Sequence, residues 1–117
     1  MSDPNRAALL EILDRNPEVL TSLQESGDDG SAIRPIEHFV YFLKGRHAKA
    51  SAKELASLGY ETSISKDGRL VCLRATKDGQ ATLEATTQMT TEVFAVTVVG
   101  HGGHYDGWGC PVVEPEA

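Results

Sequence analysis

The segment from Ile36 to Leu43 constrains the fold of this chain more than any other, because its apolar side chains alternate onto both faces. In an extended segment, successive side chains point to opposite faces. One face therefore carries Ile36, His38, Val40 and Phe42, and the other carries Phe39, Tyr41 and Leu43. A strand that is apolar on both faces is typical of the centre of a covered sheet. We therefore expect a central strand whose second face is covered by the N-terminal helices or by a second subunit in a homodimer.

Patterns along the rest of the chain predict helices and strands in a definite order. Ser2, Asp3 and Pro4 predict the start of a first helix, and Asn16–Pro17 ends it and begins a second helix capped by Asn16. After the strand at 36–43, we expect a helix over 48–58, strands over 60–65 and 69–75 joined by a turn at 66–68, a turn at 78–79, a helix over 83–99 and a last strand over 105–112. The valines of residues 83–99 also favour a strand, but the helical spacing of Leu83, Met89 and Val93 favours a helix.

This order predicts an α+β fold, namely a ferredoxin-like split βαβ sandwich with an additional N-terminal helical arm. In that fold the first strand lies between the third and the fourth. We expect the helical arm over residues 1–30, the ferredoxin-like domain over 31–113 and a short, frayed C-terminal tail over 114–117. A chain of 117 residues has the size of one domain with a core of its own.

Composition limits the classes of partner. With 17 acidic and 11 basic residues, the chain has a net charge of −6, which argues against direct binding to nucleic acid. No apolar run approaches the ~20 residues of a membrane helix, and the N-terminus lacks the pattern of a secretory signal. We therefore expect no membrane association and a cytoplasmic location. Two cysteines, Cys72 and Cys110, cannot form a disulfide framework and are expected to be reduced thiols.

Two segments carry a resemblance to a known family. The first is the loop Gly27–Ser31, of sequence GDDGS, which runs into RPIEHFVYF at residues 34–42, and the second is YDGWG at residues 105–109. Together they resemble the family of regulator of ribonuclease activity B, bacterial inhibitors of ribonuclease E, over about residues 5–113.

The resemblance implies a ferredoxin-like domain without catalysis or cofactor. It also implies a protein partner, the scaffold region of ribonuclease E, through which RNA degradation is regulated. Enterobacterial members of the family carry a long acidic C-terminal tail, whereas this sequence ends four residues after Val113. If such a tail contacts the basic scaffold, we expect weaker binding here, or a different partner.

The predicted partner-binding surface combines the acidic loop with the last strand. Its members are Asp28, Asp29, His38, Tyr105, Asp106 and Trp108. Tyrosine and tryptophan are amphipathic anchors at binding hot spots, and acidic groups steer a chain toward a basic partner. His38 would pair with a neighbour on the last strand. Structural alternatives stand beside these roles: His38 can be a hydrogen-bonded core histidine, Trp108 can close the core and Asp106 can cap a turn.

Four residues of metal-ligand type lie close together near the C-terminus. His101, His104, Asp106 and Cys110 supply atoms that zinc accepts. Their spacing matches no strong zinc template, and Gly102–Gly103 suit a tight turn, so we expect no metal site. The alternative function is a small metal-binding protein or enzyme that uses His38, His101, His104 and Asp106. The sequence has no phosphate-binding loop of the GxxxxGK type and no nucleophile elbow, so we expect no catalytic residue.

Overall fold

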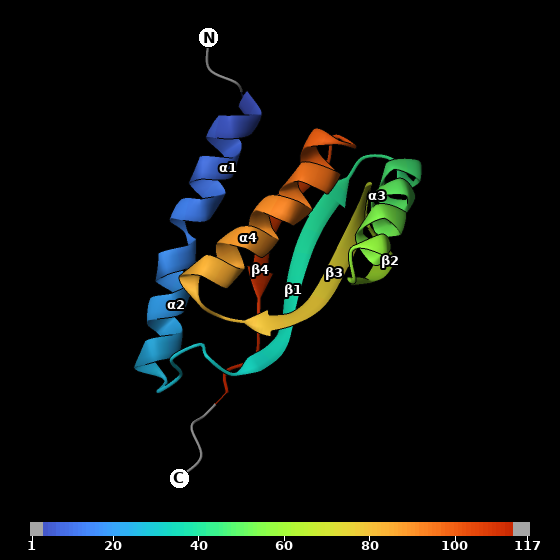
Figure 1. Ribbon diagram of the computed structural model, residues 1–117. Helices are drawn as coiled ribbons and strands as arrows, with labels where there is room; N and C mark the ends of the chain where they lie inside the picture. Colours follow the sequence, from blue (N-terminus) through green and yellow to red (C-terminus); the bar gives the residue numbers. More distant parts are fainter. Residues whose placement is uncertain (1–3, 114–117) are drawn as a thin grey trace.

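The computed structural model describes residues 4–113, which form helices on a four-stranded sheet (Figure 1). The elements are α1 (Pro4–Asp14), α2 (Asn16–Glu25), β1 (Ile33–Phe42), α3 (Gly45–Ser57), β2 (Glu61–Asp67), β3 (Leu70–Gln80), α4 (Leu83–Phe94), the π-helical turn η1 (Ala95–Val99) and β4 (His104–Gly109). The α+β fold is confirmed. The helix start predicted at residues 2 and 3 and the tail predicted over 114–117 lie outside the described residues.

The sheet has the strand order β2-β3-β1-β4, and all three neighbouring pairs are antiparallel. The first strand therefore lies between the third and the fourth, as predicted. His38 on β1 lies directly opposite Trp108 on β4, so the sheet brings together the two segments that carry the family resemblance. A register shift between Phe39 and Val40 marks a bulge in this pair.

The helices cover only one face of the sheet. The buried side chains of β1, which include Ile36, Val40 and Phe42, point toward this helical layer. The apolar residues of α1 and α2 pack into the same layer, beside α4 and along β4. Phe39 and Tyr41 lie on the opposite face and are half-buried. The expectation that the N-terminal helices cover this second face is wrong; we call it the open face.

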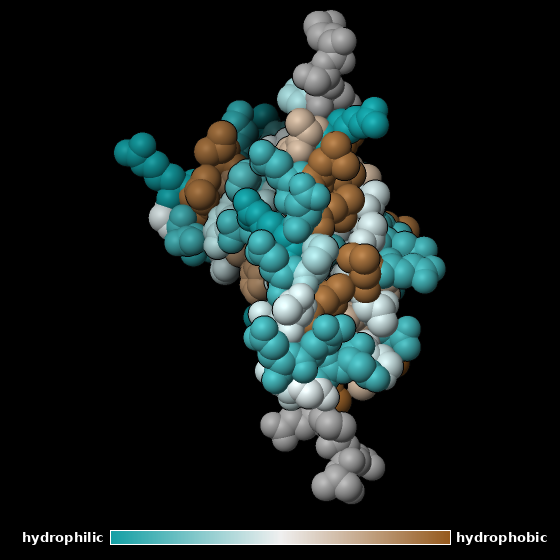
Figure 2. Space-filling view, turned by 90° about the vertical axis from the view of Figure 1, so that its left-hand side faces the viewer, coloured by the Kyte–Doolittle hydropathy of each residue, from teal (hydrophilic) through white to brown (hydrophobic). Residues whose placement is uncertain are grey.

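The N-terminal helices retain apolar groups at their own surface. Figure 2 looks at the side formed by α1 and α2 and shows hydrophobic side chains between hydrophilic ones. Leu10 is 53% exposed, and α1 has no fully buried residue among those described. None of the helices between Pro4 and Val113 combines the length and hydropathy needed to span a lipid bilayer.

Two local expectations are wrong because long-range contacts override turn chemistry. Asp78 and Gly79 do not form a turn, since they pair with Pro35 and Arg34 where β1 begins earlier than expected. Asn16 does not cap α2. Arg15 occupies the cap position without a side-chain bond, and Asn16 is buried in the first turn, where its amide oxygen accepts a hydrogen bond from Trp108.

The helix predicted over 83–99 is confirmed, with a change in its last turn. Thr82 caps α4 by accepting a hydrogen bond from the Ala85 backbone N–H. The helix continues as α4 to Phe94 and then widens into η1, and the backbone N–H of Gly103 donates to the Thr97 carbonyl oxygen at 2.8 Å. This tight closure returns the chain directly into β4.

Candidate functional site

His38 and Tyr105 form a buried polar pair between the sheet and the helices. The His38 Nδ1 and Tyr105 Oη atoms are 2.7 Å apart, and the rings of Tyr60 and Tyr105 lie about 6 Å from the imidazole. Burial lowers the pKa of His38 to about 4, because it disfavours the charged form. Burial likewise raises the pKa of Tyr105 above its ordinary value. Both side chains are therefore neutral near pH 7 and enclosed in the interior.

Trp108 faces the helices and closes the second apolar cluster. It packs against the buried residues Leu23, Ile36 and Ala81. Its indole Nε1–H donates to the Asn16 amide oxygen at 2.9 Å, which ties β4 to α2. Of the two roles considered for Trp108, these contacts support closure of the core.

Asp28 is the centre of a buried clamp. The Arg34 guanidinium donates to both carboxylate oxygens, and the backbone N–H groups of Gly30 and Val113 each donate at 2.9 Å. The hydrogen bonds from Arg34 hold the pKa of Asp28 far below its usual range, against the opposing effect of burial. The clamp joins the acidic loop, the start of β1 and the segment that follows β4.

Asp29 beside it is exposed and is bonded only within its own turn. The Ser31 hydroxyl and backbone N–H donate to it, and these bonds lower the pKa of the Asp29 carboxyl. The loop therefore contains one acidic side chain that holds structure and one that faces solvent.

The four residues considered for a shared metal or catalytic cluster do not all lie at one site. His101 Nε2 lies 3.1 Å from Glu54 Oε1 on α3, whereas His38 is buried between the sheet and the helices. His104 and Asp106 line the open face instead. Between residues 4 and 113, no three His, Cys, Asp or Glu side chains converge to hold a metal ion. Strand alternation and the turn at 100–101 separate residues that are close in sequence.

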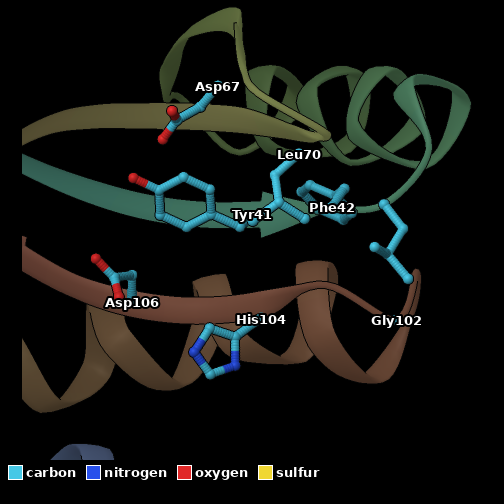
Figure 3. Close-up of a pocket in the computed structure, with 8 residues that line it drawn as sticks. Tyr41, Phe42, Asp67, Leu70, Gly102, His104 and Asp106 are labelled. Atoms are coloured by element: carbon cyan, nitrogen blue, oxygen red, sulfur yellow. The ribbon is translucent and has the colours of Figure 1, made fainter.

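Asp106 lies in a hollow of about 520 Å³ on the open face, at the end where β1 leaves the sheet. We call this hollow the Tyr41 groove; its lining is Tyr41, Phe42, Leu43, Asp67, Leu70, Gly102, His104 and Asp106. Figure 3 shows the Tyr41 ring between the Asp67 and Asp106 carboxylates, on the side of the sheet away from the helices. The groove lies at the opposite end of β1 from the acidic loop.

Most of the Tyr41 groove was missed by sequence reasoning. The strand pattern places Tyr41 and Leu43 on the second apolar face of the strand, which we expect to be covered. The sequence predicts Asp67 only as a turn residue, whereas its register opposite Leu70 places it on the same face as Tyr41. The signal that could have identified the groove is the strand alternation, which puts Tyr41 and Leu43 on one face. It identifies a binding surface only if that face is also predicted to be open.

The six predicted partner-binding residues therefore occupy three different environments. Asp29 and Asp106 are exposed, Trp108 is half-buried, and Asp28, His38 and Tyr105 are buried. Their joint role in binding stays a prediction, and only Asp106 of the six lines the Tyr41 groove.

The fold and the groove define a small α+β domain whose sheet is packed by helices on one face and open on the other. A family model for regulator of ribonuclease activity B matches residues 13–110. The chain belongs to this family, whose name denotes regulation of ribonuclease activity. No individual curated protein matches the chain.

Proposed function

We propose that this chain is a non-catalytic regulator of RNA degradation that acts by binding a ribonuclease of the ribonuclease E type. The observation that carries the proposal is the family match over residues 13–110. A regulator that works by contact needs an accessible surface, and the open face supplies one.

The placement of the polar groups supports contact rather than chemistry. His38 and Tyr105 are buried between the sheet and the helices. The Asp28 carboxylate already accepts hydrogen bonds from Arg34 and from two backbone N–H groups. These residues would shape and stabilise the domain. Asp106 is exposed in the Tyr41 groove and would meet the partner directly.

The partner region that we propose is the scaffold of ribonuclease E, and the association would occur in the cytoplasm of a bacterium. The scaffold is expected to be basic, and the net charge of −6 on this chain suits such a partner. Neither nucleic acid nor a membrane is needed for this contact. A homodimer formed on the open face is the competing arrangement, since the same surface would then be occupied by a second copy.

The test combines capture with an activity assay. The immobilised chain should retain full-length ribonuclease E but not its isolated catalytic region, and the added chain should slow RNA cleavage by the full-length enzyme only. A small acidic protein of matched net charge serves as the control. Equal retention by that control, or unchanged cleavage, would remove the ribonuclease assignment.

A further inference from the structure

We infer that the Tyr41 groove is a docking site for an extended protein segment that alternates basic and apolar side chains. This inference rests on the proposed function and deepens it, because it assigns the contact to one surface and one partner chemistry. Three features of the groove carry it: exposed apolar side chains, two free carboxylates and a half-buried aromatic ring.

The apolar part of the groove comes from two leucine side chains that are exposed to solvent. Leu43 is 82% exposed and Leu70 is 37% exposed, and they line the same hollow as the Tyr41 ring. Exposed leucines beside an aromatic ring in a concave site are typical of a binding surface. An apolar side chain of the partner would be removed from water here.

The charge of the groove comes from two strands on either side of Tyr41. Asp67 ends β2 and Asp106 lies on β4, which are separated by three strand spacings, or about 14 Å between backbones. Both side chains are exposed, and neither forms a hydrogen bond or an ion pair within residues 4–113. Arg15, between α1 and α2, lines two smaller hollows beside Asp106 but forms no ion pair with it. Two unpaired carboxylates flanking an aromatic ring favour cationic side chains, which also bind the ring face.

The pKa of Tyr41 agrees with this electrostatic environment. The Cys72 thiol beside it has the largest effect, and the Asp67 and Asp106 carboxylates add to it; all of these raise the pKa of the Tyr41 phenol. The phenol is therefore neutral near pH 7, and the negative charge of the groove comes from Asp67 and Asp106.

The charge of the site favours a basic extended segment over a second copy of this chain. An extended segment presents alternate side chains to one surface, so basic and apolar groups can reach the acids and the leucines together. A two-fold contact centred on the groove would instead place the groove against its own equivalent, with like charges facing each other.

The experiment is a fluorescence-anisotropy titration of the purified full chain with a short labelled peptide of alternating arginine and leucine. The same peptide with citrulline in place of arginine keeps the shape and removes the charge. The groove variant is Asp67→Asn with Asp106→Asn. The matched control is Asp14→Asn with Asp78→Asn, which removes two exposed carboxylates elsewhere and changes the net charge equally.

We expect the groove variant to bind the arginine peptide at least about fivefold more weakly than the control variant. Leu43→Ser should also weaken binding, and the citrulline peptide should bind the unaltered chain more weakly than the arginine peptide. Circular dichroism should show all variants folded, since the altered side chains are exposed.

Three results would overturn the inference: no binding of the arginine peptide, equal binding of the two peptides, or equal losses in the groove and control variants. Self-association of the unaltered chain that Leu43→Ser abolishes would show that a second copy occupies the groove, and would overturn it too.

The outcome is separable from that of the proposed function. Groove variants that still capture ribonuclease E would defeat the docking site while leaving the regulator assignment intact. Failure of the unaltered chain to capture the enzyme would defeat that assignment, whereas the peptide titration would still report on the groove.

Discussion

At the scale of single residues, burial separates the polar groups that a motif places side by side. His38 and Tyr41 lie on the same strand, yet the first is enclosed with Tyr105 and the second faces the open side. Asp28 and Asp29 are adjacent, yet only Asp28 reaches Arg34. The direction of one side chain therefore determines whether a residue stabilises the domain or meets a partner.

His38 should make the stability of the protein depend on pH. The unfolded chain takes up a proton near the ordinary pKa of 6.5, whereas folded His38 stays neutral down to about pH 4. The contribution is thus fully present above pH 6.5 and is lost as the pH falls toward 4, by about 3 kcal/mol. Urea unfolding, followed by the fluorescence of Trp108, the only tryptophan in the chain, should show this fall. The His38→Gln variant should show a flatter dependence over this range, and an unchanged slope would contradict the prediction.

Asp28 and Asp29 offer a matched pair of substitutions. Asp28→Asn should destabilise the fold by about 3 kcal/mol, because it leaves the buried Arg34 without an anionic partner. Asp29→Asn removes the same charge at an exposed site and should lower the free energy of unfolding far less, because the amide oxygen can still accept from Ser31. Hydrogen exchange gives a second measurement, since the Val113 amide should exchange faster only in the Asp28 variant. Equal effects of the two substitutions would show that the clamp does not stabilise the domain.

At the scale of elements, the structure depends on close approaches between segments that are distant in sequence. The loop before β1 meets the end of β3 at Gly30, whose carbonyl accepts a hydrogen bond from the Ala81 N–H at 2.8 Å. Asn16 and Trp108 connect α2 to β4 in the same manner. The conformational preferences of neighbouring residues cannot predict either contact, because each joins segments that are distant in sequence. The predictions of an Asn16 cap and a turn at 78–79 are wrong for this reason.

Gly30→Ala should therefore be much more harmful than a glycine substitution in a free turn. Gly30 has a φ of +80°, and an added Cβ would collide with the Ala81 backbone carbonyl. We expect a loss of about 2–4 kcal/mol in the free energy of unfolding. Gly68→Ala is the control, since its φ of +63° carries only backbone strain and nothing lies within 4 Å of an added Cβ. The control should lose about 1 kcal/mol of the free energy of unfolding. Urea unfolding measures both variants, and equal losses would show that the close approach of Gly30 to Ala81 is unimportant.

At the scale of the whole molecule, net charge and the open face act together. A net charge of −6 attracts a basic partner, and dissolved salt screens this attraction and shortens its range. Stopped-flow association with the ribonuclease E scaffold should therefore slow by about tenfold between low and physiological salt, with a smaller change in the dissociation rate. An association rate that is independent of salt would exclude electrostatic steering by this chain.

Local pattern was sufficient for the element order, the α+β class and the central place of β1, because alternation and helical spacing act within a few residues. It was also sufficient for the pairing of His38 with the last strand, since strand order follows from that element order. Chain folding in three dimensions was needed to show which face of β1 stays open, because both faces are apolar in sequence. The Tyr41 groove joins residues from all four strands with Gly102, and the Asp28 clamp joins the loop to Val113. Such sites depend on register and packing between distant segments, and no local pattern contains that information.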